Sequence, residues 1–180
     1  MLENLFSNKC RIKLSQHNGK YFVCLTDAQA ATSITIQGLP QDTLVIKGDD
    51  FKSPDSVFNG QKGECKRADF IIFSNDGSKK KIIIIETKKG SADNKEIVQQ
   101  LKGSKCFVEY CKKITAEFFD NHCLDSYQYR FVAIQKIRLD KRTTRDKSRG
   151  SKQSAHDTPD DYFKITNPKV LEFNHLSGRV

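Results

Sequence analysis

The chain has 180 residues and a formal net charge of +9, with 31 Lys and Arg against 22 Asp and Glu. This length fits one domain with a hydrophobic core of its own, and no apolar stretch is long enough to suggest a membrane span. The first residues also lack the basic-then-apolar pattern of a secretion signal, so we expect a cytoplasmic protein that does not contact membranes. The basic excess suits a polyanionic partner such as nucleic acid, although charge alone decides little.

Six cysteines lie along the chain at irregular spacings, and no two of them form a CxxC pair. These spacings do not fit a zinc or disulfide framework, so we expect reduced thiols, most of them buried beside apolar neighbours. His122-Cys123 together with Cys111 is the one cluster that we keep as a candidate zinc site.

Residues 1–60 are expected to form a β-rich segment. An Asn18-Gly19 step between two apolar runs favours a hairpin. The segment carries no residue spacing typical of a catalytic motif, and we treat it as an N-terminal elaboration. Its expected strands are short: Cys10–Leu14, Lys20–Leu25, Ile34–Ile36 and Thr43–Ile46.

The central stretch, residues 67–88, reads RADFIIFSNDGSKKKIIIIETK. Two isoleucine-rich runs, Phe70–Phe73 and Ile82–Ile85, flank a polar turn with an Asp-Gly step, which predicts an antiparallel hairpin. Both runs are apolar on both faces, so we expect strands that are buried inside a sheet.

The two apolar runs contain no charged residue, and the charges stand at their ends. Asp69 begins the first strand, and Glu86 and Lys88 end the second. The start of one antiparallel strand lies beside the end of its partner, and residues two apart share a face, so these side chains should meet. Two carboxylates beside a lysine predict a divalent-metal site with oxygen ligands. The alternative is a buried hairpin whose terminal charges are simply solvated.

Asp69, followed after sixteen residues by Glu86-Thr87-Lys88, resembles the D…ExK signature of the PD-(D/E)XK nuclease superfamily, which includes restriction enzymes and junction resolvases. Ala68 stands where the name of the motif has proline. The resemblance covers roughly residues 64–134. It implies that Asp69, Glu86 and the Thr87 carbonyl hold Mg²⁺ or Mn²⁺, and that Lys88 orients or deprotonates the attacking water.

A long helix is predicted after the hairpin. Asp93 and Glu96 fit an N-cap followed by a capping-box acid. Helical spacing then predicts about six to seven turns with one buried face. The expected buried residues are Ile97, Leu101, Ser104, Val108, Cys111, Thr115 and Phe118. A further apolar run, Arg130–Ile134, completes a ββαβ order in which the last strand is parallel to Ile82–Glu86.

Gln100 lies twelve residues beyond Lys88, where many members of the superfamily carry a glutamine near the metal site. Its neighbour Gln99 points about 100° away around the helix, so the two cannot both face the site. A solvated helix residue is the alternative for Gln100. Ser104 stands where one exonuclease branch has tyrosine, and an exonuclease of that branch is therefore not supported.

Three residues just before Asp69 are further candidates. Arg67 and Lys66 would hold a phosphate, and Arg67 is the better candidate because alternation puts it on the face of Asp69. An ordinary salt bridge is the alternative for Arg67. Glu64 is either an additional metal ligand or a surface glutamate.

Residues 138–152 hold seven basic residues against two acids and almost no apolar side chains. We expect a mobile loop, spanning 138–158, whose basic residues, Arg142 and Arg145 among them, grip phosphates. The loop contains no aromatic residue to stack on a base, which favours contact with the backbone of the nucleic acid. Closing strands are predicted at Asp161–Ile165 and Val170–Phe173, within residues 159–180.

The expected fold is therefore a single α/β domain over residues 1–180, with its catalytic core at 61–136. The resemblance implies a restriction-endonuclease-like mixed central sheet with a long crossover helix. It also implies a Mg²⁺-dependent endonuclease, acting on DNA rather than RNA, with defence among its settings and a homodimer among its assemblies. The alternatives are a nucleic-acid-binding module without turnover and a protein-interaction module.

Overall fold

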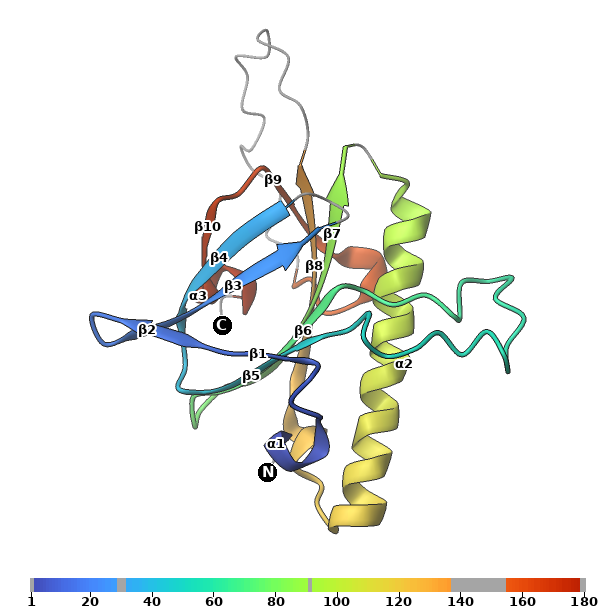
Figure 1. Cartoon of the computed structure of the whole chain (residues 1–180), viewed down its shortest axis with the longest axis horizontal. Helices are drawn as coiled ribbons and strands as arrows, with labels where there is room; N and C mark the ends of the chain where they lie inside the picture. The colour runs from blue at the N-terminus through green and yellow to red at the C-terminus, as the bar shows by residue number, and fades with distance from the viewer. Residues whose placement is uncertain (1, 29–31, 91, 137–154, 179–180) are drawn as a thin grey trace, which may run out of the picture.

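The computed structural model describes residues 2–28, 32–90, 92–136 and 155–178. Two β-sheets and one long helix form three layers, with the six-stranded sheet in the middle (Figure 1). The elements in chain order are α1 (Leu2–Leu5), β1 (Arg11–Ile12), β2 (Ser15–His17), β3 (Lys20–Asp27), β4 (Thr32–Leu39), β5 (Asp42–Lys47), β6 (Phe70–Asn75), β7 (Lys80–Lys89), α2 (Asn94–Phe119), η1 (Cys123–Ser126), β8 (Gln128–Lys136), η2 (Pro159–Asp161), β9 (Phe163–Thr166), β10 (Val170–Glu172) and α3 (Phe173–Leu176). The mixed α/β class is confirmed.

The central sheet has the strand order β1-β5-β6-β7-β8-β9. The predicted hairpin is present, because β6 and β7 pair antiparallel through the turn that contains Asp76 and Gly77. The helix α2 connects β7 to β8, and these two strands are parallel, as the ββαβ order predicts. β9 extends the sheet parallel to β8.

Two apolar cores lie on the two faces of the central sheet. Alternate residues of β7 face opposite sides, so that Ile83 and Ile85 pack against the second sheet while Ile82 and Ile84 pack against α2. All four isoleucines are fully buried. This double burial explains why the run is apolar at every position.

The N-terminal segment is β-rich, as predicted, but it is divided between the two sheets. β1 and β5 join the central sheet, whereas β2, β3 and β4 form the second sheet with β10, in the order β10-β4-β3-β2. The hairpin between β2 and β3 turns at Asn18 and Gly19, whose φ angles of 48° and 76° suit an Asn-Gly turn.

The helix α2 has 26 residues and begins after the predicted N-cap, Asp93, whose side chain accepts a hydrogen bond from the backbone N–H of Lys95. Its buried face contains every predicted residue except Phe118, which is 81% exposed in the last turn. That prediction was wrong because this end of α2 lies beyond the strands of the central sheet (Figure 1). Glu96 forms no capping box, since its carboxylate contacts Lys88 instead.

Several predictions fall partly or wholly outside the described residues. Arg142, Arg145 and the other basic residues of 138–152 lie there. Within the described part of the chain, all six cysteines are free thiols, but only Cys111 is buried, so the expectation of mostly buried thiols was wrong. None of the helices there combines the length and the apolar character that a membrane crossing needs.

Candidate functional site

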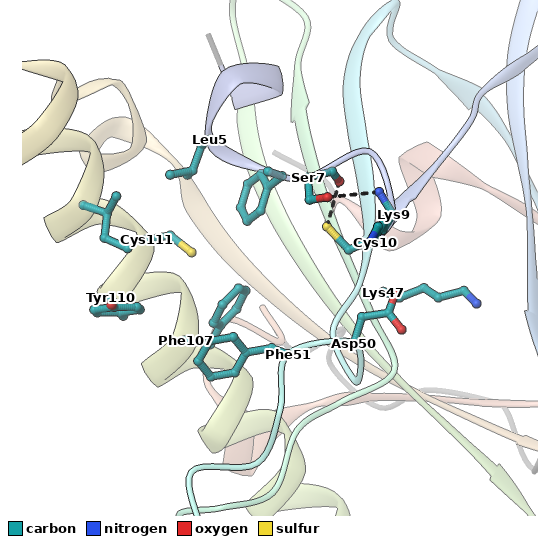
Figure 2. A pocket seen from close by; sticks show the side chains of 12 residues that line it. Leu5, Ser7, Lys9, Cys10, Lys47, Asp50, Phe51, Phe107, Tyr110 and Cys111 are labelled. Atoms are coloured by element: carbon teal, nitrogen blue, oxygen red, sulfur yellow. Dashed lines mark hydrogen bonds between the residues drawn. The ribbon is translucent and has the colours of Figure 1, made fainter.

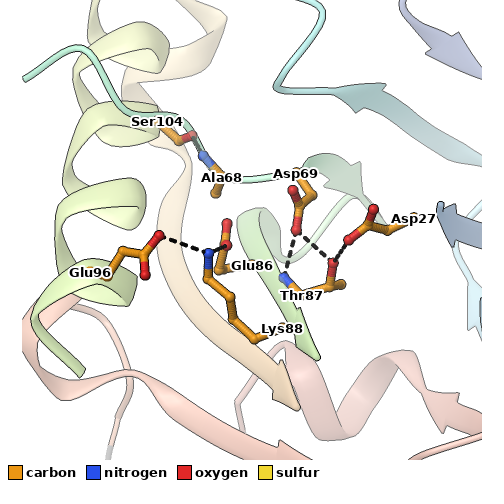
Figure 3. A network of polar contacts seen from close by, with 8 residues as sticks. All are labelled: Asp27, Ala68, Asp69, Glu86, Thr87, Lys88, Glu96 and Ser104. Carbon is orange, nitrogen blue, oxygen red and sulfur yellow. Dashed lines mark hydrogen bonds and ion pairs between the residues drawn. The ribbon is translucent and has the colours of Figure 1, made fainter. Parts of the chain in front are cut away.

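The charged ends of the β6–β7 hairpin lie together at one end of the central sheet (Figure 3). The last register pair joins Phe70 to Ile85, so one further step places Asp69 opposite Glu86. The negative charge of Asp69 adds to the rise that burial causes in the pKa of Glu86. Lys88 lies on the face of Glu86, with 3.0 Å between its Nζ and Glu86 Oε1.

Glu86 is the buried acid of this group, with 1% of its surface exposed. Burial raises the pKa of Glu86 to about 8, the charge of Asp69 adds to the rise, and the contact with Lys88 only partly offsets it. Glu86 Oε2 has no hydrogen-bond partner among the described residues. A buried carboxylate oxygen without a partner is rare in proteins and indicates a missing polar or cationic neighbour.

Lys88 bridges β7 and α2. Its Nζ lies 3.0 Å from Glu86 Oε1 and 3.2 Å from Glu96 Oε1. Burial by itself lowers the pKa of Lys88, but the two glutamates outweigh burial, and the net pKa is raised. The ammonium group therefore keeps its proton in this arrangement and is suited to donate hydrogen bonds.

Asp69 is held by Thr87. The backbone N–H and the Oγ1 hydroxyl of Thr87 both lie 2.6 Å from Asp69 Oδ2. Burial raises the pKa of Asp69 to about 6, the two bonds from Thr87 oppose the rise, and the charges of Asp27 and Asp49 add to it. The resemblance assigns the Thr87 carbonyl to a metal, and the structure adds a second role for this residue, which is to orient Asp69.

The same hydroxyl contacts a second carboxylate, that of Asp27 at the end of β3, also at 2.6 Å. A hydroxyl carries a single proton, so one of its two contacts needs a proton on a carboxyl group. Asp27 therefore brings the second sheet into the site, which the sequence analysis missed. Thr87 is 60 residues away from Asp27 in sequence, and no local pattern connects them.

Asp49 is a further acid beside the site, and the sequence analysis did not single it out. The backbone N–H of the preceding Gly48 donates to Asp69 O at 2.7 Å, which brings Asp49 close to Asp69. Burial raises the pKa of Asp49, and the charges of Asp50 and Asp27 raise it further.

Ala68 and Ser104, the two positions that depart from the pattern of the superfamily, contact each other. The backbone N–H of Ala68 donates to Ser104 Oγ at 2.7 Å, and both residues are fully buried. Proline at position 68 has no N–H and could not make this bond. The bond ties the segment that precedes β6 to the third turn of α2.

Gln100 lies one helical turn from Glu96 and one turn from Ser104, which are the two residues that tie α2 to the site. Its Oε1 atom is buried and has no partner within the described part of the chain. The neighbouring Gln99 points elsewhere, as predicted, and its Nε2 donates to Lys62 O at 3.0 Å.

Gln135 on β8 is a site residue that the sequence analysis missed. It is 1% exposed, and neither its Oε1 nor its Nε2 has a partner among the residues that the structure describes. Its register partner on β7 is Lys88, and by alternation with Phe131 and Ala133 it faces α2, as Glu86 does. A polar residue within the apolar run of a strand was the available signal.

Three other predicted residues lie away from the carboxylates. Arg67 Nη1 donates to the backbone carbonyls of Glu64 and Lys66, at 3.2 and 2.6 Å, and its guanidinium lies over the ring of Phe51. Arg67 and Asp69 both precede β6, so strand alternation does not orient them, and a face shared by the two stays a prediction.

The Glu64 side chain is exposed and accepts a hydrogen bond from the backbone N–H of Lys62 at 2.9 Å. Hydrogen bonds from the local backbone lower the pKa of Glu64. It is therefore a surface glutamate, which was the second of the two interpretations. Lys66 approaches α2 through its backbone carbonyl, beside Gly103.

Within the described ranges, no group of three or more His, Cys, Asp or Glu side chains is arranged to hold a metal ion. The candidate zinc cluster is therefore not formed, and His122 Nδ1 instead lies 3.3 Å from Asp125 Oδ2. A cation between Asp69 and Glu86 would need further oxygens from the backbone and from water, which Mg²⁺ commonly uses.

We compared the chain with known proteins. No family model, no curated protein and no solved structure matches it. A family assignment therefore rests on the residues of the hairpin and on their geometry.

Proposed function

We propose that the protein is a divalent-metal-dependent nuclease of the PD-(D/E)XK type, with a restriction-endonuclease-like fold. The observation that carries this proposal is the convergence of Asp69, Glu86 and Lys88 at one end of a buried hairpin. Glu86 Oε2, which is buried and has no partner among the described residues, supports a cation at this position.

The oxygen donors fit a hard divalent cation. Asp69 and Glu86 supply two carboxylates, and the Thr87 carbonyl is the third oxygen that the resemblance assigns. A Mg²⁺ or Mn²⁺ ion held by these residues would polarise the scissile phosphate and lower the pKa of a water bound to it. Thr87 keeps Asp69 in place through its N–H and hydroxyl groups, so that ligand geometry is set before the cation arrives.

Lys88 is assigned to orienting the attacking water and to stabilising negative charge on the phosphorane-like transition state. Its raised pKa favours these roles over that of a general base. Gln135 and Gln100 offer amide groups toward the same side of the sheet, where a water or a phosphate oxygen would satisfy them.

The expected substrate is DNA, cleaved internally. The net charge of +9 supports a polyanionic substrate. DNA is placed ahead of RNA on the resemblance alone, and a homodimer that cuts both strands belongs to the same proposal.

The decisive experiment measures cleavage of linear, circular and branched DNA, and of RNA, with Mg²⁺, Mn²⁺ or EDTA. Lys88→Ala and Asp69→Asn are expected to lower the cleavage rate by at least roughly 100-fold while the fold and most of the nucleic-acid affinity remain. Lys89→Ala is the matched control, because Lys89 is the exposed neighbour of Lys88 and points to the other face of β7.

Full cleavage by either variant would end the metal-hydrolysis account. Nucleic-acid binding by the wild type with no cleavage under any metal condition, and with no Mn²⁺ binding in calorimetry, would instead identify a binding module without turnover.

A further inference from the structure

A second pocket lies away from the carboxylates, between α2 and the connection from β5 to β6. This connection runs out alongside α2 (Figure 1), and it is held there by the bond from Gln99 to Lys62 O and by the contact of the Phe51 and Phe107 rings, whose centroids are 4.6 Å apart. The pocket has a volume of about 630 Å³. That size is within the range of pockets that bind small molecules.

The lining of this pocket is almost entirely apolar. Its apolar walls are formed by Phe51, Pro54, Phe58, Cys106, Phe107 and Tyr110. The floor is closely packed, because a Cβ atom at Gly103 would lie 1.9 Å from Lys66 O. A larger pocket of about 750 Å³ adjoins it across the rings of Phe51 and Phe107 (Figure 2). The lining of this larger pocket includes two lysines and an aspartate.

Four charged side chains line the smaller pocket, and only that of Arg67 lacks an opposite charge. Lys102 is paired with Asp160 at 2.9 Å, and Lys62 lies beside Glu64, whose pKa it helps to lower. Among the described residues, Arg67 makes no ion pair. Burial lowers the pKa of Arg67, which is the direction expected for a cation that has lost water without gaining an anion.

The guanidinium of Arg67 belongs to the lining of the pocket. Nη1 donates to two backbone carbonyls and the guanidinium lies over the Phe51 ring. Nε is buried and has no partner among the described residues. Nε and Nη2 form the edge of a guanidinium that binds a carboxylate or a sulfonate through two parallel hydrogen bonds.

We propose that this pocket binds a small anionic amphiphile, with its apolar body between α2 and the 48–67 connection and its single anionic group on the guanidinium of Arg67. A nucleobase fits less well, because its edge carries several donors and acceptors and the walls offer almost none. This site is separate from the proposed nuclease chemistry and does not depend on it.

The test uses two fluorescent probes with the same aromatic body. Anilinonaphthalene sulfonate carries an anionic group, and phenylnaphthylamine is neutral. Wild-type protein is expected to bind the sulfonate about tenfold more tightly or better, and decanoate should displace it. Arg67→Met keeps the apolar stem but removes the charge, and it should make the two affinities equal. Lys113→Met, an exposed charge removal on the same helix, is the matched control and should change neither.

Cys106→Trp provides a variant that fills the pocket and keeps the Arg67 side chain, in case Arg67→Met does not fold by circular dichroism. It should weaken both probes by about tenfold or more. Equal affinity of the wild type for both probes, an unchanged preference in Arg67→Met, or displacement of the sulfonate by a short DNA duplex but not by decanoate would each overturn the proposal. None of these binding measurements uses a divalent cation or nuclease activity. Their result can therefore be interpreted even if the proposed nuclease function is wrong.

Discussion

The free energy of unfolding should fall as pH rises through the titration of Glu86. The folded protein raises the pKa of this carboxyl group from 4.5 to about 8, chiefly by burial. Below pH 4.5 the group is protonated in both folded and unfolded states. Between these two values the unfolded chain loses the proton and the folded chain keeps it, so the unfolded state binds fewer protons and stability falls with pH. Above about pH 8 the loss is complete.

The size of this effect follows from the shift. At 1.36 kcal/mol for each pH unit, the full rise corresponds to roughly 4–5 kcal/mol, a large share of the 5–15 kcal/mol that is typical of a whole domain. Asp69 contributes in the same direction at lower pH, because its pKa is raised from 3.8 to about 6. From pH 6 to pH 8 the slope therefore reports mainly Glu86, and we expect a loss of about 2–3 kcal/mol over this interval.

The assay is urea unfolding at several pH values between 5 and 9, with EDTA and then with Mg²⁺. Glu86→Gln keeps the shape of the side chain but removes the titration, so its slope between pH 6 and pH 8 should be smaller than that of the wild type by the amount above. Glu117→Gln removes a carboxylate from the exposed surface of α2 and should keep the wild-type slope. A cation that binds ionised Glu86 should stabilise the wild type more at pH 8 than at pH 6, and should lose this effect in Glu86→Gln.

Two results would refute this reasoning. If wild type and Glu86→Gln lose stability equally between pH 6 and pH 8, Glu86 is ionised in the folded protein and the burial argument fails. If Mg²⁺ stabilises Glu86→Gln as much as the wild type, the cation binds somewhere other than at Glu86.

Three further predictions concern neighbouring residues. Gln135→Leu should raise the free energy of unfolding by about 1–3 kcal/mol in urea unfolding, because it removes two buried amide atoms that have no partner among the described residues. The same variant should slow cleavage in a nuclease assay. Asp27→Asn should lower the pKa of Asp69 by removing a like charge, so a carbon-13 NMR titration of the Asp69 carboxyl group should show its midpoint below the value of about 6 in the wild type. Gly103→Ala should destabilise the protein by about 1–3 kcal/mol, since its Cβ would lie 1.9 Å from Lys66 O, whereas an ordinary helix position gains stability from this change; a gain here would contradict the packing.

Those parts of the fold that depend on local patterns could be predicted from the sequence. The hairpin follows from two isoleucine runs around an Asp-Gly step, and α2 follows from Asp93 and the helical spacing after it. The predictions failed where tertiary contacts decide. Glu96 gives up the capping box because Lys88 offers an ion pair. Strand alternation does not orient Arg67, since this residue precedes β6.

Some residues of the candidate site could be predicted from the sequence, and others could not. Asp69, Glu86 and Lys88 could be found because a buried strand tolerates charges only at its ends, and a hairpin brings two such ends together. Asp27 and Gln135 could not be placed, since the first reaches the site from the other sheet and the second through a parallel strand that follows a 26-residue helix. The bond from Thr87 to Asp27 and the pairing of Gln135 with Lys88 each join residues that are distant in sequence. Composition and residue spacing do not encode such pairings.

The energetics of Glu86 connect the fold with the proposed function. A carboxyl group that is 1% exposed, with one oxygen unpartnered and with a second acid beside it, destabilises the folded chain at neutral pH. An apolar residue would continue the isoleucine run of β7 and stabilise the sheet without this penalty. Lys88 cannot be the reason for keeping the acid, because its charge fails to return the pKa of Glu86 to its ordinary value. A cation at Glu86 would reverse the sign of the effect, since it favours the ionised form that burial disfavours. The residue that weakens the apo protein is thus the one expected to gain most from metal, and the pH dependence of stability measures that exchange directly.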